Sequence, residues 1–129
     1  MSGEEPILAG ASVIVLEDDY YLATDLRSAL LAAGAEVIGP FPEEADARLG
    51  LGGGNPDCAL VDINLGHGPI FDLSRELLEQ GVPLTFVTGY DASAIPGDLH
   101  SVERLQKPVD PDQAVLAVAR LLGRDPTTR

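Results

Sequence analysis

Short apolar runs, rich in β-branched residues, alternate along the chain with longer stretches that have the spacing of amphipathic helices. The runs predicted as strands are residues 13–16, 36–39, 58–61, 84–87 and 102–106. The stretches predicted as helices are residues 20–33, 42–51, 69–80 and 110–122, with a shorter helical turn at 91–95. The first of these runs, residues 13–16, contains no polar residue, which is typical of a strand that is buried on both faces, and the run at 102–106 is the weakest of the five. The pattern predicts an α/β fold, a doubly wound five-stranded parallel sheet with helices on both faces.

The length and charge of the chain exclude several classes of function. Its 129 residues fit one domain, and its net charge of −13 argues against binding to nucleic acid or to an anionic membrane surface. No apolar run approaches the ~18 residues that a transmembrane helix needs, and no signal-peptide pattern follows Met1. Because the single cysteine, Cys58, cannot form an internal disulfide, we expect a cytoplasmic protein.

Polar residues stand where the predicted strands end. In doubly wound sheets the functional crevice lies beyond the carboxyl ends of the strands, so these residues are expected to meet. In chain order they are Glu17, Asp18 and Asp19 after the first strand, Asp62 and Asn64 after the third, Thr88 and Gly89 after the fourth, and Lys107 after the fifth. Asp19 is also a good N-cap for the following helix.

The residue types at these strand ends predict a metal-assisted phosphoryl-transfer site. Three carboxylates in one crevice repel one another, and a divalent cation with oxygen ligands, Mg²⁺ above all, removes that conflict. Lys107 would pair with an anion bound on the metal, and the Thr88 hydroxyl and the Gly89 N–H would donate hydrogen bonds to it. Because the chain has no GxxxxGK[ST] loop, we expect an aspartate that is itself phosphorylated rather than ATP chemistry.

Over residues 11–123 the chain resembles the receiver domain of two-component response regulators, which is flavodoxin-like with strand order 2-1-3-4-5. The resemblance rests on the segments VIVLEDD, LVDINL, FVTGY and LQKP, in that order and each at a strand end. It implies that Asp62 is the phosphoacceptor and that Glu17, Asp18, Asp62 and the backbone carbonyl of Asn64 hold Mg²⁺. It also implies that Thr88, Lys107 and the Gly89 N–H bind the phosphoryl group, and that the Lys107–Pro108 bond is cis.

A closer resemblance is to stand-alone receivers of alphaproteobacteria, which carry a Phe-Ala-Thr-Gly signature with a nearby Tyr and an Asn-Leu-Gly stretch after the acceptor. The matching segments here are residues 86–90 and 64–66. Two positions depart from the broader family. Arg104 stands where an aromatic residue often reports phosphorylation, and Gly66-His67-Gly68 replaces a proline after the acceptor. Tyr90 is a candidate to take over the aromatic role.

The resemblance predicts a single-domain response regulator of a phosphorelay, which is not an enzyme. It would take a phosphoryl group from a sensor histidine kinase or a histidine phosphotransferase domain and signal through a downstream protein or by onward phosphotransfer. The expected organisation is a flexible segment at 1–10, the receiver at 11–123, and a tail at 124–129 without an output domain. A homodimer through the face of the fourth and fifth strands is a further expectation.

Two alternatives remain open from the sequence. A pseudo-receiver that is not phosphorylated would act as a binding or dimerisation module, although the full set of site residues argues against it. A phosphatase of the haloacid dehalogenase type would use an aspartyl nucleophile, but such enzymes need an acid where this chain has Asn64.

Overall fold

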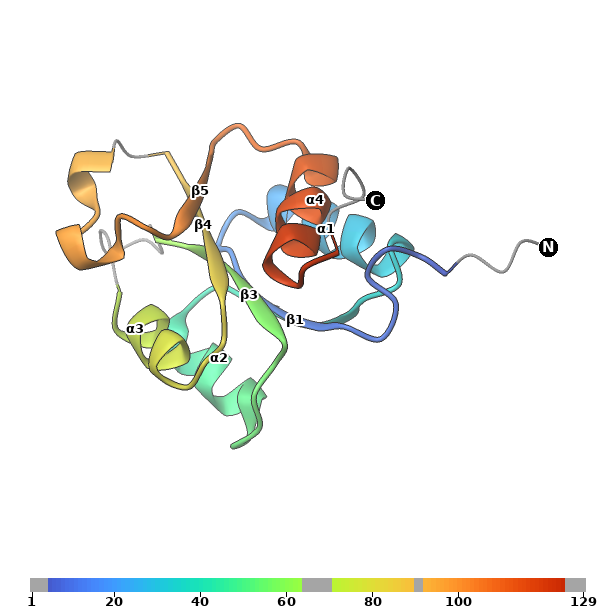
Figure 1. Cartoon of the computed structure of the whole chain (residues 1–129), viewed down its shortest axis with the longest axis horizontal. Coiled ribbons are helices and arrows are strands. Elements are labelled where there is room, and N and C mark those ends of the chain that lie inside the picture. Colours follow the sequence, from blue (N-terminus) through green and yellow to red (C-terminus); the bar gives the residue numbers. More distant parts are fainter. Residues whose placement is uncertain (1–4, 64–70, 90–91, 125–129) are drawn as a thin grey trace.

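The computed structural model describes residues 5–63, 71–89 and 92–124 (Figure 1). The strands are β1 (Ser12–Leu16), β2 (Glu36–Phe41), β3 (Cys58–Asp62), β4 (Leu84–Thr88) and β5 (Glu103–Gln106). The helices are α1 (Tyr20–Ala32), α2 (Glu44–Leu51), α3 (Asp72–Glu79) and α4 (Pro111–Leu121). Two short 3₁₀ turns, η1 (Ala92–Ala94) and η2 (Gly97–Leu99), lie between β4 and β5.

The five strands form one parallel sheet in the order β2-β1-β3-β4-β5, which confirms the predicted fold class. Alternate residues of β1 point to opposite faces: Ile14 packs in one core cluster with Leu77 of α3, and Val13 packs in another with Leu30 of α1. Helices α1 and α4 therefore cover one face, and α2 and α3 cover the other (Figure 1). This topology places the carboxyl ends of the strands along one edge.

Helices α1 and α4 begin at capping residues that the sequence identifies. Asp19 is the N-cap of α1, and its carboxylate accepts hydrogen bonds from the backbone N–H groups of Tyr21 and Leu22. Asp110 caps α4 in the same way, and Pro111 occupies its first turn. The caps fix the points at which the chain leaves the sheet edge and turns into each helix.

The segment between β4 and β5 differs from the prediction. Instead of a single helical turn at 91–95, the structure has η1 and, beyond Pro96, a second turn η2 whose Leu99 is buried. Pro96 ends the first turn, as predicted, but its carbonyl then accepts a hydrogen bond from the Leu99 N–H. The start of the helix predicted at 69–80 and the first residue of the turn predicted at 91–95 lie outside the described residues.

Residues 7–9, within the stretch predicted to be flexible at 1–10, are anchored to the rest of the described chain. The Leu8 side chain is fully buried, and its backbone N–H donates to the carbonyl of Ala33. The Arg124 guanidinium donates to the carbonyls of Ile7 and Ala9. The packed part of the chain therefore begins before the predicted boundary at residue 11. None of the helices described is both long and apolar enough to cross a membrane.

We expect Thr85→Val to stabilise the protein. Thr85 lies in β4, fully buried, and its hydroxyl has no hydrogen-bond partner among the described residues. Valine has nearly the same shape and removes the cost of burying that hydroxyl, so the free energy of unfolding should rise by about 1 kcal/mol in urea titrations. The matched control, Thr24→Val at an exposed position of α1, should change it by less than about 0.5 kcal/mol. A loss of stability in Thr85→Val would contradict this reading of the core.

Candidate functional site

Four of the predicted site residues lie at the ends of neighbouring strands. Asp62 is the last residue of β3 and Thr88 the last of β4, whereas Glu17 and Lys107 directly follow β1 and β5. Since these four strands are parallel and adjacent, their carboxyl ends bring the side chains to one edge of the sheet. The grouping predicted from strand ends is therefore the grouping that the topology provides.

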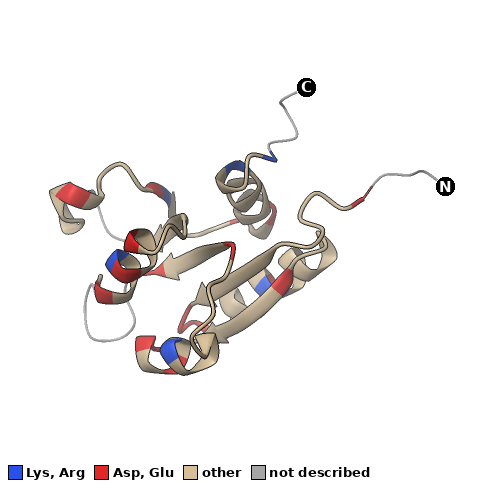
Figure 2. Ribbon diagram, turned by 60° about the horizontal axis from the view of Figure 1, so that its bottom comes forward, with Lys and Arg blue, Asp and Glu red and all other residues tan. Residues whose placement is uncertain are grey.

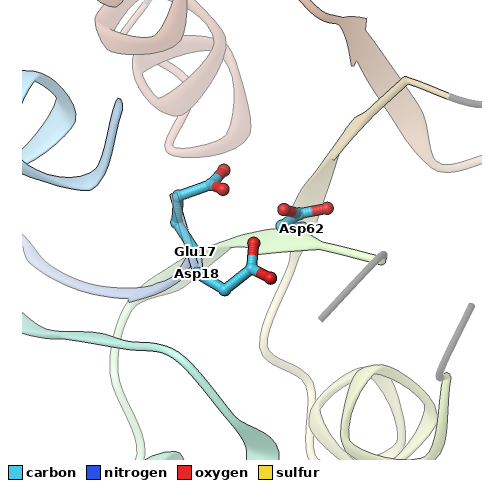
Figure 3. Close-up of side chains that lie close together, drawn as sticks. All are labelled: Glu17, Asp18 and Asp62. Atoms are coloured by element: carbon cyan, nitrogen blue, oxygen red, sulfur yellow. The ribbon is translucent and has the colours of Figure 1, made fainter. Parts of the chain in front are cut away.

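Glu17, Asp18 and Asp62 form an acidic cluster at this edge. Each offers a carboxylate oxygen, and the three oxygens lie within 4.8 Å of one another. Figure 3 shows the three groups gathered between the ends of β1 and β3. Glu17 is 3 % exposed and Asp62 is 0 % exposed, whereas Asp18 is open to solvent. Two negative groups are thus held out of water, a costly arrangement unless a cation lies close by.

Lys107 supplies positive charge to both buried carboxylates. Its Nζ donates to Asp62 Oδ2 at 2.9 Å and to Glu17 Oε2 at 3.1 Å. Partial burial disfavours the charged lysine, but the two carboxylates outweigh it and hold the pKa of Lys107 above its ordinary value. The lysine therefore remains protonated, and its contacts with carboxylates at the ends of β1 and β3 fix the position of its ammonium group.

Glu17 is only partly satisfied by these contacts. Its Oε2 accepts hydrogen bonds from Lys107 and from the Asp19 N–H at 3.1 Å, but its Oε1 is buried without a partner among the described residues. Burial, then a hydrogen bond to Asp62 that only the protonated Glu17 carboxyl can donate, and the charge of Asp62 raise the pKa of Glu17 to about 7, although Asp19 and Lys107 oppose the shift. One ammonium group thus does not balance the negative charge of the cluster.

The acidic cluster fits a hard divalent cation. Its ligand atoms are carboxylate oxygens, as Mg²⁺ prefers, and a cation would give the orphaned Glu17 Oε1 a partner. Glu17, Asp18 and Asp62 are the described residues that could hold it. The fourth ligand predicted from the sequence, the carbonyl of Asn64, lies outside the described residues.

Thr88 and Gly89 close the site on the β4 side. Thr88 is buried, and its backbone carbonyl accepts the Lys107 N–H at 2.8 Å, which joins the ends of β4 and β5. Gly89 follows as an exposed residue without a side chain to obstruct its N–H. The Lys107–Pro108 bond is cis, as predicted, and so is Gly39–Pro40, which the sequence analysis did not anticipate.

The structure describes Arg104, which stands at the usual aromatic position, but not Tyr90, the candidate to replace that aromatic residue. Arg104 lies in β5 with its side chain exposed, and Tyr90 lies outside the described residues. The replacement of the usual aromatic switch by Tyr90 stays a prediction.

Sequence reasoning missed one contributor to the site, the end of β2. The carbonyl of Phe41 accepts the backbone N–H of Glu17 at 2.9 Å. The predicted strand stopped at residue 39, two residues short of this contact. The sequence carries one signal that could have pointed to this support. Gly50 lies inside the following helix, where a glycine lowers stability and usually marks a place at which another group packs closely.

Comparison with known proteins identifies the fold. No protein-family model and no curated protein matches the sequence. Among solved structures, the chain is similar to the signal receiver domain of a modulated diguanylate cyclase from Desulfovibrio desulfuricans G20, at 26 % identity and a TM-score of 0.75 over 89 % of this chain and 95 % of that one. The fold is that of a response-regulator receiver domain.

Two further structures agree with this result. A response regulator receiver protein from Sinorhizobium medicae WSM419 is 26 % identical, with a TM-score of 0.73 over 88 % of this chain and 94 % of that one. The receiver domain of the PhyR response regulator from Erythrobacter litoralis has a TM-score of 0.77 over 94 % of this chain and 96 % of that one, but at 21 % identity it supports the fold alone.

We expect the stability contributed by Glu17 to depend on pH when no divalent cation is present. Its folded-state pKa of about 7 lies above the ordinary value of 4.5. The folded protein therefore binds this proton more tightly than the unfolded chain, and the resulting stability, full below pH 4.5, is lost as the pH rises through about 7. In urea titrations with EDTA, the free energy of unfolding should fall more from pH 5 to pH 8 in wild type than in Glu17→Gln.

The control for this experiment is Glu79→Gln, which removes an exposed carboxylate from α3. Its pH dependence should follow that of wild type. Parallel profiles for wild type and Glu17→Gln would show that Glu17 is not the group that resists ionisation.

Proposed function

We propose that this chain works as the receiver of a two-component phosphorelay and that Asp62 accepts a phosphoryl group from a phosphohistidine. The observation that supports this most is a fully buried aspartate at a strand end, 2.9 Å from a lysine ammonium and next to two more carboxylates. In the proposed step an Asp62 oxygen attacks phosphorus and the P–N bond breaks. The imidazole nitrogen keeps the electron pair and takes up a proton.

The other site residues have distinct roles in this proposal. Glu17, Asp18 and Asp62 would hold Mg²⁺, with the Asn64 carbonyl, and the cation would offset the charge of the transferring group. Lys107 keeps the acceptor oriented and is placed to pair with a phosphoryl oxygen. The Thr88 hydroxyl and the Gly89 N–H, at the end of β4, are donors for the remaining oxygens.

The signal would arise from a shift between two arrangements of the loops after β4 and β5. Movement of Thr88 and Lys107 toward a phosphoryl group changes the backbone on both strands, because the Lys107 N–H donates to the Thr88 carbonyl. A downstream protein would recognise that change, or a phosphotransferase domain would take the group onward. Membership of the stand-alone alphaproteobacterial receivers and a homodimer through the β4–β5 face belong to the same proposal.

The phosphoacceptor role is tested by Asp62→Asn. With acetyl phosphate and Mg²⁺, wild type should gain the mass of one phosphoryl group in intact-protein mass spectrometry, and the variant should gain none because the amide is a poor nucleophile. Asp112→Asn, which changes an exposed aspartate in the first turn of α4, is the matched control and should label like wild type.

The same experiment separates the alternatives. Labelling of Asp62→Asn at the wild-type level would overturn the assignment of the acceptor. A wild type that is never labelled, from acetyl phosphate or from a phosphorylated kinase, would favour the pseudo-receiver. Steady release of phosphate from simple esters would favour a phosphatase.

The surface next to the acidic cluster suits a protein donor. Tyr20 and Tyr21 are 74 % and 79 % exposed, and their rings stack edge to face with centroids 5.5 Å apart. A hollow of about 540 Å³ is lined by Tyr21, Lys107 and the exposed Asp19 and Asp25, among others. Figure 2 shows acidic residues over most elements and few basic ones. We propose that the donor presents apolar and basic side chains to this surface.

Tyr21→Ala should distinguish docking from chemistry. Loss of an exposed aromatic anchor should slow phosphotransfer from a phosphohistidine protein by roughly ten-fold, whereas labelling by acetyl phosphate should not change. Leu49→Ala, at an exposed apolar position on α2, should affect neither reaction. Equal slowing with both donors would show that Tyr21 acts on the site itself rather than on docking.

A further inference from the structure

The backbone N–H of Glu17 is held by an irregular pairing between β1 and β2. Ile14 lies opposite Ile38, but Leu16 lies opposite Phe41, so β2 contains one more residue than β1 over this stretch. The Phe41 carbonyl accepts the Glu17 N–H at 2.9 Å. The position of Glu17 at the end of β1 thus depends on where the chain places Phe41.

Gly39 allows the extra residue in β2. Its φ of +100° lies in the left-handed region, and a Cβ at this position would be 2.9 Å from the carbonyl oxygen of Val15. Only glycine combines that backbone conformation with so close an approach. The irregularity is therefore encoded in the sequence of β2 rather than imposed by a neighbouring element.

The absence of a side chain at Gly50 of α2 leaves the space that the Phe41 ring occupies. A Cβ at position 50 would lie 2.2 Å from Phe41 Cζ and 2.8 Å from Cε2, far inside contact distance. Glycine within a helix costs about 0.5–1 kcal/mol relative to alanine, so its presence near the end of α2 needs a packing reason. The ring contact supplies that reason, and Phe41 also packs against the buried core cluster under α2 and α3.

The Glu17 side chain is held at its other end as well. Its Oε2 accepts hydrogen bonds from Lys107 and from the Asp19 N–H. The backbone contact to Phe41 and these two bonds together leave Oε1, buried and without a partner among the described residues, as the oxygen that remains for a cation.

We infer that Phe41, whose ring packs against Gly50, is a positioning residue. It sets the cation affinity of the acidic cluster through its hydrogen bond to the backbone of Glu17. This inference rests on the proposed function only in that Glu17 holds a divalent cation. It predicts that a substitution on the surface of α2, outside the cluster itself, changes metal binding.

The test is a calorimetric titration of Mg²⁺ at pH 8 into wild type and Gly50→Ala. The alanine methyl group must displace the Phe41 ring, and the Mg²⁺ dissociation constant should rise roughly ten-fold, as when groups that orient metal ligands are altered. Gly54→Ala is the matched control, because residue 54 is not in the left-handed region and its Cβ would meet only the Leu51 carbonyl oxygen at 3.5 Å. Its affinity should equal that of wild type.

A compensating variant separates positioning from general damage. Phe41→Leu alone keeps the carbonyl but loses the ring contact, and should weaken Mg²⁺ binding several-fold. In Gly50→Ala/Phe41→Leu the smaller side chain leaves room for the methyl group, so affinity should return toward the wild-type value. If Gly50→Ala alone does not fold, the single Phe41→Leu variant and the double variant still decide the question.

A second readout does not depend on metal. In the metal-free protein, the ¹H–¹⁵N signal of the Glu17 amide should move in Gly50→Ala and stay unchanged in Gly54→Ala. An unchanged amide signal together with unchanged Mg²⁺ affinity would overturn the inference. A moved signal with unchanged affinity would show that the contact is structural only. Absence of Mg²⁺ binding in wild type would refute the metal site of the proposed function, and this inference with it.

Discussion

The site depends on one ammonium group that lies between two buried carboxylates. Without Lys107, Asp62 and Glu17 would be negative groups held away from water, which proteins avoid unless the charges are paired. With it, the cluster remains short of positive charge, since Asp18 adds a third carboxylate and Glu17 Oε1 has no partner among the described residues. Lys107 thus stabilises the buried carboxylates enough for the folded site to form, and the negative charge that remains can still attract a cation.

The parallel sheet makes that arrangement possible. Glu17, Asp62 and Lys107 come from positions up to 90 residues apart in the sequence, yet each stands at the carboxyl end of a strand of the same parallel sheet. The 21 acidic residues that give the chain its net charge of −13 fall into two groups. Three acids belong to the cluster, and the others are mainly surface groups that limit which partners can approach.

The residues at the site could be predicted because strand ends are local features of the sequence. A run of buried residues that ends in Asp62, or a cap at Asp19, is recognisable without knowing what lies beside it. The support from Phe41 could not be found in this way, since it depends on an irregular register between two strands and on a ring packed against Gly50. The burial of Leu8 and the turn η2 were missed because both depend on distant packing partners rather than on local pattern.

The same contacts imply how a change at Asp62 would spread. Lys107 Nζ now divides its hydrogen bonds between Asp62 and Glu17. A phosphoryl group on Asp62 would neutralise the carboxylate and place negative charge farther from the strand, so the lysine would follow that charge or keep Glu17 as its other hydrogen-bond partner. Because the Lys107 N–H is bonded to the Thr88 carbonyl, movement of the lysine backbone pulls on the end of β4. The ion pair that stabilises the unmodified site is therefore also the connection through which its modification would reach the loops after β4 and β5.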